Sequence, residues 1–411
     1  MIPYQKRILK NGLTVVVNRD RSSKLAAVNI LYKVGARNED PDRTGFAHLF
    51  EHLMFRGTRD VPSFDLPVQM ASGEDNAFTN NDYTNFYLTL PVDNLETALW
   101  LESDRMQGLW ITPEKLETEK RVVIEEFRQR YLNQPYGDQT MLLRELAYSV
   151  HPYRWATIGR STDHIEGATL KEVEHFYRTF YRPSNAVLAI SADCDEEVLF
   201  ALAEKWFGAL QDTPFTHSPI PQEPPQCAPR TKIVERDVPA TTISIAYHMG
   251  DRLSKDFCTG DLVSDLLSGG DSSRLYQHLV KDERLFASVN GYISGDVDPG
   301  LFILTGQLLP TTTEEQAIAA FHRETAALKT IAPSDYELEK VKNKFEANTL
   351  FGELNVMNKA MNLCYYDFLG DLELVNREID EYRAIDGERI FEFAERIFRP
   401  ENSSTLIYRA R

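Results

Sequence analysis

Two histidines and a glutamate stand in an otherwise apolar stretch of the sequence, GFAHLFEHLMF, at residues 45–55. His48 and His52 are four residues apart, and Glu51 follows His48 by three. On an α-helix, residues at these spacings share one face, so both imidazoles can reach one ion with the carboxylate beside them. The alternative is a polar stripe on a surface helix, but the surrounding Phe, Leu and Met residues indicate a buried helix.

The residue types in this motif suit a zinc ion. Neutral imidazoles and a carboxylate are common Zn²⁺ ligands, and an open coordination position would carry a water whose pKa falls toward about 7. The order HxxEH is the inverse of HExxH, and the chemical requirement is the same: a carboxylate near that water to accept its proton. The motif therefore predicts a hydrolytic zinc centre.

A third protein ligand is expected from the segment ETEKRVVIEEFRQRY, residues 117–131, which has a helical pattern. Glu119 and Glu126 are seven residues apart and so share a helix face. Val122 and Val123 are expected on the buried side of this helix. The residues alone do not choose among Glu119, Glu125 and Glu126 as the ligand.

The pattern of elements predicts an α+β fold. Strands are expected at residues 12–19, 26–35 and 85–91, and helices at about 44–55, 93–108 and 113–133. Strands and helices that are interspersed without strict alternation are typical of α+β domains.

The sequence also repeats itself. NILYKVG at residues 29–35 resembles SIAYHMG at 244–250, and each is followed by a second glycine ten residues later, Gly45 and Gly260. YRPSNAVLAI from Tyr181 resembles FRPENSSTLIY from Phe398, and PEKLETEK from Pro113 resembles PSDYELEK from Pro333. These ordered matches predict a duplicated domain, with halves at 1–211 and 231–411 joined by a proline-rich linker at 212–230.

The bulk properties exclude some classes of function. A formal charge of −17 and a pI near 5.1 argue against nucleic-acid binding, which relies on clustered Lys and Arg. No apolar run is long enough to span a membrane, and the first residues lack the pattern of a secretory signal. The four cysteines form no CxxC pair and are expected to be small buried thiols. These features predict a cytoplasmic, bacterial protein; periplasmic export of a trimmed chain is the less favoured alternative.

The motifs together resemble the pitrilysin/insulinase family of zinc peptidases, the inverzincins, which includes the mitochondrial processing peptidases. FAHLFEHLMFRGT resembles the zinc helix of the family, EDNAFTNNDYTNFYLTLP its substrate strand, and ETEKRVVIEEF its third-ligand helix. The segment at residues 151–193 resembles the end of the first domain of the family. The resemblance implies two homologous α+β domains, each a mostly antiparallel sheet packed against helices, and one Zn²⁺ per chain.

Carried over to this sequence, the resemblance makes His48, His52 and Glu126 the metal ligands and Glu51 the general base. Glu119 would then orient a ligand histidine from behind. Asn76, Ala77, Phe78 and Thr79 would form an edge strand whose backbone pairs with an extended peptide substrate. Without the resemblance, the alternative for Asn76 and its neighbours is an ordinary turn into the next strand.

The second half has lost this chemistry. The places of His48, Glu51 and His52 fall on Val263, Leu266 and Leu267, while Glu346 stands opposite Glu126. The second domain is therefore expected to enclose the substrate without catalysing.

Active family members often carry an Arg and a Tyr, seven apart, in the second domain, and these bind the substrate and its oxyanion. Here LVKDERLFASV, residues 279–289, has Val280 and Ala287 at those places, and Arg274 and Tyr276 lie outside the required spacing. This absence predicts a heterodimer in which a homologous subunit without HxxEH supplies the pair. A homodimer or monomer, with Lys281, Arg284 or another cation substituting, is the rival.

The predicted function is that of a zinc metalloendopeptidase acting on extended or unfolded peptides, as the zinc-bearing subunit. The alternative from another class is a non-catalytic scaffold or core subunit of the same fold, which binds partner proteins and does no chemistry.

Overall fold

The computed structural model describes residues 1–212 and 216–411, and the chain packs into two compact units. Unit 1 consists of residues 1–128, 155–220 and 350–377, and unit 2 of residues 129–154, 221–349 and 378–411. The units differ from the contiguous halves at 1–211 and 231–411 because each contains one segment from the other half. In the predicted linker, residues 213–215 lie outside the described residues, and the others form no helix or strand before Arg230.

Unit 1 is built on a six-stranded sheet with the order β1-β2-β6-β3-β5-β4. Only β2 and β6 pair in parallel; every other neighbouring pair is antiparallel. The strands predicted at 12–19, 26–35 and 85–91 correspond to β2, β3 and β5. The strand bounds are Gln5–Ile8 (β1), Thr14–Arg19 (β2), Leu25–Tyr32 (β3), Glu74–Thr79 (β4), Thr84–Pro91 (β5) and Ala186–Ala192 (β6).

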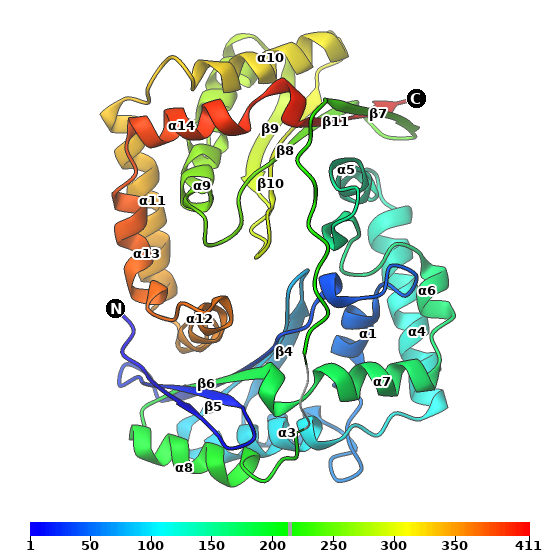
Figure 1. The fold of residues 1–411 in the computed structure, drawn as a ribbon, viewed down its shortest axis with the longest axis vertical. Coiled ribbons are helices and arrows are strands. Elements are labelled where there is room, and N and C mark those ends of the chain that lie inside the picture. Colours follow the sequence, from blue (N-terminus) through cyan, green and yellow to red (C-terminus); the bar gives the residue numbers. More distant parts are fainter. Residues whose placement is uncertain (213–215) are drawn as a thin grey trace. The chain divides into compact units, whose positions relative to one another are not determined.

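Helices cover both faces of this sheet. The helices α3 and α8 pack on one face, and α12 lies on the opposite face against β3 and β6 (Figure 1). Ala360, Leu363 and Cys364 of α12 are fully buried in that second layer. The helices of unit 1 are α1 (Phe46–Leu53), α2 (Asp65–Met70), α3 (Leu95–Gln107), α4 (Pro113–Phe127), α6 (Thr162–Glu166), α7 (Leu170–Phe180), α8 (Glu196–Phe207) and α12 (Val356–Leu369).

Unit 2 contains a five-stranded sheet with the order β7-β11-β8-β10-β9. Its first pair is parallel and the others are antiparallel, as in the β2-β6-β3-β5-β4 part of unit 1. The shared order and strand direction confirm the α+β fold with two similar domains. The strand bounds are Arg230–Arg236 (β7), Thr242–His248 (β8), Phe286–Ile293 (β9), Leu301–Leu308 (β10) and Ser403–Ala410 (β11).

The two halves of the chain exchange one helix each. In unit 1, α12 comes from the second half of the sequence, and in unit 2, α5 comes from the first half and packs on β8 and β11. Each exchanged helix fills an apolar layer on a sheet face that would otherwise meet water. The helices of unit 2 are α5 (Gln139–Ala147), α9 (Lys255–Ser268), α10 (Glu314–Ala327) and α14 (Gly387–Ile397). Two further helices, α11 (Asp335–Gly352) and α13 (Leu374–Arg383), run across the division between the units.

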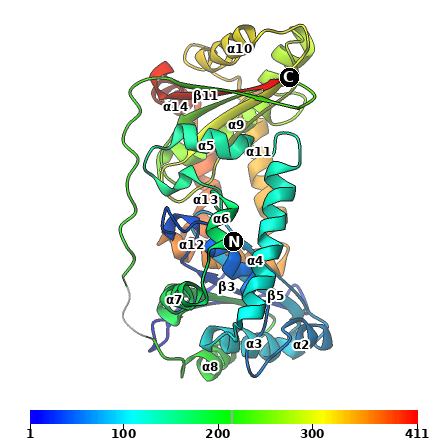
Figure 2. The same cartoon turned by 90° about the vertical axis from the view of Figure 1, so that its right-hand side faces the viewer.

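The helix α4 is the longest in unit 1 and packs against α6 (Figure 2). It begins at Pro113, and the hydroxyl of Thr112 accepts a hydrogen bond from the Lys115 amide. After Phe127 the chain continues as a π-helical turn at Arg128–Leu132, so the helix predicted at 113–133 changes its winding near its end. Val123 is buried as expected, but the prediction for Val122 was wrong, because its exposed fraction is 41%.

The remaining bulk expectations were met in part. No helix within the described ranges is long and apolar enough to cross a bilayer. All four cysteines are free, and Cys258 and Cys364 are buried. The expectation of burial was wrong for Cys227, which is exposed, and Cys194 is only partly covered.

Candidate metal centre

The helix α1 presents two different faces. Phe46, Leu49, Phe50 and Leu53 are buried, and the ring of Phe50 stacks on Phe176 of α7 with a centroid distance of 5.0 Å. These apolar contacts fix the rotation of α1 about its axis. His48, Glu51 and His52 consequently project together from the other side of the helix.

Three ionisable side chains meet between α1 and α4. The Nε2 atoms of His48 and His52 lie 3.7 Å and 3.5 Å from Oε2 of Glu126. One ligand atom from each residue can be chosen so that all three lie within 4.8 Å of one another. Ligands of a tetrahedral zinc ion at bonds of about 2.0–2.2 Å are separated by roughly 3.3–3.6 Å, and the distances from the two histidines to Glu126 are close to this spacing.

Glu119 lies behind His52 on the same face of α4 as Glu126. Its side chain is 1% exposed, with Oε2 3.6 Å from Nδ1 of His52 and Oε1 2.6 Å from Nε of Arg56. A carboxylate on the second ring nitrogen fixes the imidazole tautomer and leaves Nε2 for a metal. Arg56, which lies in the turn after the end of α1, was not identified from the sequence.

Glu125 points elsewhere. Its side chain is 54% exposed and lies 3.8 Å from Nη1 of Arg128. Among the three glutamates left open by the residues alone, the structure brings Glu126 to both histidines and Glu119 to His52. The helical rotation of α4, fixed by buried Leu116 and Val123, produces this choice.

The general-base candidate contacts the predicted substrate strand. The Thr79 hydroxyl donates a 2.6 Å hydrogen bond to Oε2 of Glu51. Thr79 is the last residue of β4, which pairs only with β5 among the described strands and so forms an edge of the sheet. The carboxylate is therefore tied to the strand edge where an added peptide strand could pair.

The edge strand has amide groups that face away from the sheet. The Asn80 amide bonds to the Tyr83 carbonyl at the β4–β5 turn, and antiparallel pairs alternate between bonded and non-bonded. In this alternation Asn76 and Phe78 bond toward β5, whereas the amides of Ala77 and Thr79 point outward. Consistent with this, the Ala77 amide donates to the Asn76 side chain, at 2.8 Å.

Nearby carboxylates change the acid–base behaviour of His52. Burial lowers the pKa of His52, but its contacts with Glu119 and Glu126, together with the charges of Glu126 and Glu51, outweigh burial and raise the pKa to about 9. In the metal-free chain at neutral pH this imidazole is therefore protonated. A metal must displace that proton before it can bind.

The corresponding positions in unit 2 are apolar. Val263, Leu266 and Leu267 lie on α9 with exposed fractions of 0–1% and belong to the core of that unit. Glu346 on α11 accepts a hydrogen bond of 2.6 Å from Nε of Arg383. At the positions that correspond to the ligands, α9 therefore packs into the core of unit 2.

The segment that would carry the Arg and Tyr pair is also different. Val280 packs against the core of unit 2, and Ala287 is exposed on the edge strand β9. Arg274 forms a two-pronged salt bridge with Glu337, with distances of 2.8 and 3.1 Å. Arg274 is thus engaged in the structure of its own unit.

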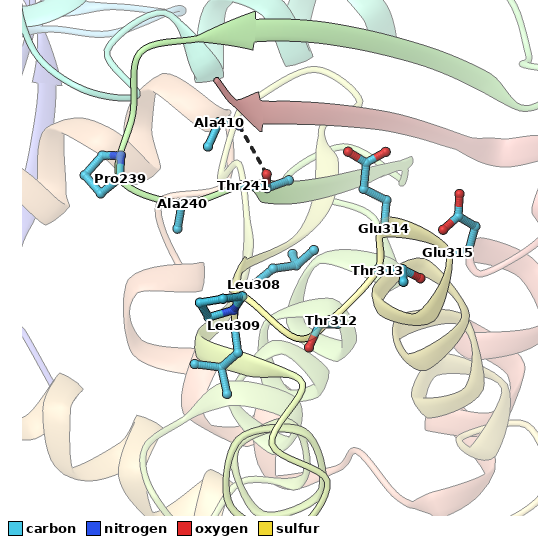
Figure 3. Close-up of a pocket in the computed structure, with 11 residues that line it drawn as sticks. Pro239, Ala240, Thr241, Leu308, Leu309, Thr312, Thr313, Glu314, Glu315 and Ala410 are labelled. Carbon is cyan, nitrogen blue, oxygen red and sulfur yellow. Dashed lines mark hydrogen bonds between the residues drawn. The ribbon is translucent and has the colours of Figure 1, made fainter.

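Unit 2 also has a cavity of about 470 Å³ near the ends of β10 and β11 (Figure 3). Its lining includes Glu314 and Glu315 at the start of α10, and Thr241, whose hydroxyl accepts a hydrogen bond from the Ala410 amide. Glu314 is paired with Arg409 at 2.7 and 2.8 Å. The lining contains none of the predicted site residues.

Comparison with known proteins assigns the family. "Insulinase (Peptidase family M16)" matches residues 14–159, and "Peptidase M16 inactive domain" matches residues 167–345. Zinc protease PqqE of Helicobacter pylori is 32% identical over 376 residues, which cover 90% of this chain and 80% of that protein. The chain belongs to the insulinase family, peptidase family M16.

Other relatives agree with this assignment. The uncharacterized zinc protease YmxG of Bacillus subtilis is 24% identical, with 97% of this chain and 96% of that protein covered. The crystal structure of a protease from Helicobacter pylori superimposes with a TM-score of 0.93 at 28% identity, over the full length of both chains. A structure titled as a peptidase M16 inactive domain, from Pseudomonas fluorescens, shares the fold with a TM-score of 0.89 at 19% identity. M16 members thus include chains named proteases and domains named inactive, so the site of each chain has to be judged by its own residues.

We expect Glu126→Gln to lower zinc affinity by at least about a hundredfold, because the neutral amide is a poor ligand for Zn²⁺. Glu125→Gln, one residue away and facing Arg128, is the matched control and should retain zinc. Zinc content after dialysis, measured by atomic absorption, checks both variants. Loss of zinc from Glu125→Gln with retention by Glu126→Gln would contradict the assignment.

We also expect zinc binding to release about one proton at pH 7.5. The folded metal-free protein has a His52 pKa of about 9, above the ordinary value of 6.5, so the proton is present below pH 9 and is lost as pH rises through that value. Zinc affinity should accordingly increase with pH up to about 9. Calorimetric titrations in buffers of different ionisation enthalpy measure the proton count. Glu119→Gln should reduce it; no release from the wild type at pH 7.5 would contradict the protonated state of His52.

Proposed function

We propose that this chain is a zinc metalloendopeptidase that hydrolyses peptide bonds in extended or unfolded peptides. The observation that carries the proposal is the joint placement of the three ligand candidates, His48, His52 and Glu126, with Glu51 hydrogen-bonded to an open strand edge. A metal centre alone would suit many functions. A carboxylate whose charge acts on His52 and which is hydrogen-bonded to a strand edge suits the cleavage of a main chain that pairs with that edge.

The residues have distinct roles in this mechanism. His48, His52 and Glu126 would hold a zinc ion, which would supply Lewis-acid polarisation of a carbonyl group and acidify water. Glu51 accepts the proton of the attacking water and delivers it to the leaving amine. Thr79 holds the Glu51 carboxylate by its hydroxyl, and Glu119 keeps the His52 ring in its orientation.

The substrate is bound through its main chain. The outward amides of Ala77 and Thr79 are placed to pair with an extended peptide, and Asn76 releases the Ala77 amide when the peptide arrives. Phe78 and Asn76 project to the sheet face opposite that of Thr79, because side chains alternate along a strand. Binding of this kind selects for extended segments more than for one side chain.

A homologous partner completes the site in this proposal. The chain lacks the Arg and Tyr pair, and Arg274 is held by Glu337. The oxyanion formed during cleavage needs donors, whose loss commonly costs several kcal/mol of transition-state stabilisation. A heterodimer with a subunit that lacks HxxEH but carries the pair would supply them. A self-sufficient homodimer or monomer using Lys281 or Arg284 is the rival arrangement.

A second candidate function is a non-catalytic scaffold or core subunit that binds partner proteins. The loss of the ligand face from α9 shows that packing alone is compatible with this fold. The catalytic proposal is favoured because a scaffold has no use for two histidines, Glu126 and Glu51 in one cluster. Zinc content distinguishes the two functions at low cost.

We expect the purified zinc-loaded chain, with its homologous partner, to cleave a quenched unstructured peptide. Glu51→Gln should retain zinc and lower kcat by roughly a hundredfold or more, because proton transfer is lost while the ligands remain. Turnover of the Glu51→Gln variant near the wild-type rate would remove Glu51 from the base role. Full activity of the wild-type chain alone would refute the heterodimer and leave the peptidase proposal standing.

We expect Ala77→Pro to lower kcat/KM for peptide cleavage by about tenfold or more. The proline removes an amide that faces away from β5, so the pairing of β4 with β5 is preserved while a bond to the substrate is lost. Ala77→Val keeps the amide and serves as the control, and circular dichroism checks the fold of both. Unchanged kcat/KM in a folded Ala77→Pro variant would rule out strand pairing at this residue.

A further inference from the structure

The start of α1 lacks a side-chain cap of its own. Its N-cap residue is Gly45, with φ of 92° in the left-handed region, and a glycine has no group to offer the first amides of the helix. A Cβ atom here would lie 2.6 Å from the Ile158 carbonyl oxygen and 2.7 Å from Cδ1 of Ile165. Any residue with a capping side chain is thereby excluded from this position.

Glu39 supplies the missing acceptors from a preceding loop. The Gly45 amide donates to Oε2 of Glu39 at 2.9 Å, and the Ala47 amide donates to Oε1 at 2.8 Å. Glu39 is 7% exposed, and no part of the peptidase mechanism uses it. Burial raises the pKa of Glu39, whereas the hydrogen bonds donated to its oxygens by the amides of Ala47, Gly45 and Phe46 lower it by favouring the ionised form.

The loop that carries Glu39 is itself anchored. The Trp155 indole donates to the Ala36 carbonyl at 3.0 Å, and the Thr44 hydroxyl accepts from the Arg160 amide at 2.8 Å. The Thr44 amide also donates to Nδ1 of His164. The loop therefore holds Glu39 in a fixed position at the first turn of α1. A carboxylate is favourable there because the N-terminus of a helix carries partial positive charge.

The position of this first turn matters for the metal centre. His48 directly follows Ala47, whose amide Glu39 binds, and Glu51 and His52 are carried by the same short helix. The opposing ligand Glu126 comes from a different helix, α4, whereas the hydrogen bonds of Glu39 hold the start of α1. A shift of α1 along its axis would therefore change the distances from both histidines to Glu126 together.

We infer that Glu39 is a positioning residue that sets the placement of α1 against α4 and thereby the ligand geometry of the metal centre. The inference rests on the proposed metal site but does not require peptidase activity. Both oxygen atoms of Glu39 are engaged, so the number of acceptors at this position determines how firmly the first turn is held.

The experiment compares Glu39→Met, which has a similar length and no strong acceptor, with Glu39→Gln, which keeps one carbonyl acceptor. Zinc affinity is measured by competition with a chelator at a temperature where circular dichroism shows each variant to be folded. We expect Glu39→Met to bind zinc at least about tenfold more weakly than the wild type, with Glu39→Gln in between. The visible absorption of the Co²⁺-loaded variants should shift in the same order, because it reports ligand geometry.

Asp386→Ala is the control, because it removes a helix cap that stabilises the fold but lies on a helix without metal ligands. Asp386 caps α14 in unit 2 by accepting from the Arg389 amide at 2.9 Å, and α14 carries no ligand. This control should lower the melting temperature and leave zinc affinity and the Co²⁺ spectrum unchanged. Folded Glu39 variants that behave like Asp386→Ala would overturn the inference.

Two further outcomes are decisive. If Glu39→Met does not fold, wild-type zinc affinity and a wild-type Co²⁺ spectrum in Glu39→Gln also reject the positioning role. If the wild-type chain binds zinc but cleaves no peptide with or without a partner, the proposed function fails while the order of zinc affinities still tests Glu39.

Discussion

The structure of unit 1 depends on the fixed placement of α1 against α4. This placement brings carboxylates that repel one another together with two imidazoles. Glu51, Glu119 and Glu126 gather around His48 and His52, and Glu119 is almost fully buried. Such a group of charges is stable only with positive charge among them, from Arg56, from a protonated His52 or from a metal ion. The aromatic packing of α1 on α7 and the apolar face of α4 provide the rigid frame that keeps these charges together.

The chain uses one architecture twice but keeps the charged cluster in only one copy. The sheets of the two units share strand order and direction. On α9, Val263, Leu266 and Leu267 pack into the core, whereas α1 carries the HxxEH residues at the corresponding positions. Apolar residues at these positions remove the cost of burying charge. The exchange of α5 and α12 between the halves also means that neither half of the sequence completes its apolar layers alone.

In the proposed mechanism, substrate binding and proton transfer are connected by the hydrogen bond from Thr79 to Glu51. Thr79 ends the edge strand and donates to Glu51, so the strand that offers outward amides also orients the carboxylate. Displacing β4 would consequently disturb both the pairing edge and the proton acceptor. Through this bond the strand residues 76–79 and the HxxEH residues 48–52 act as one site in the proposed mechanism.

The sequence by itself determined the local features. The 3.6-residue period placed His48, Glu51 and His52 on one face, and alternation located β2, β3 and β5, because both signals depend on near neighbours in the chain. Ordered repeats indicated two similar domains, because they need only a comparison of the two halves of the sequence. The helical pattern of α4 left Glu119, Glu125 and Glu126 open, and only the resemblance to a family pointed to Glu126. The tertiary structure brings Glu126 to the histidines and turns Glu125 toward Arg128. Tertiary structure alone decided the exchange of helices α5 and α12, the contact of Thr79 with Glu51 and that of Glu39 with the start of α1. These contacts join segments that are apart in the sequence and come together only when the chain packs. A local sequence pattern therefore does not predict which distant residue a side chain will contact.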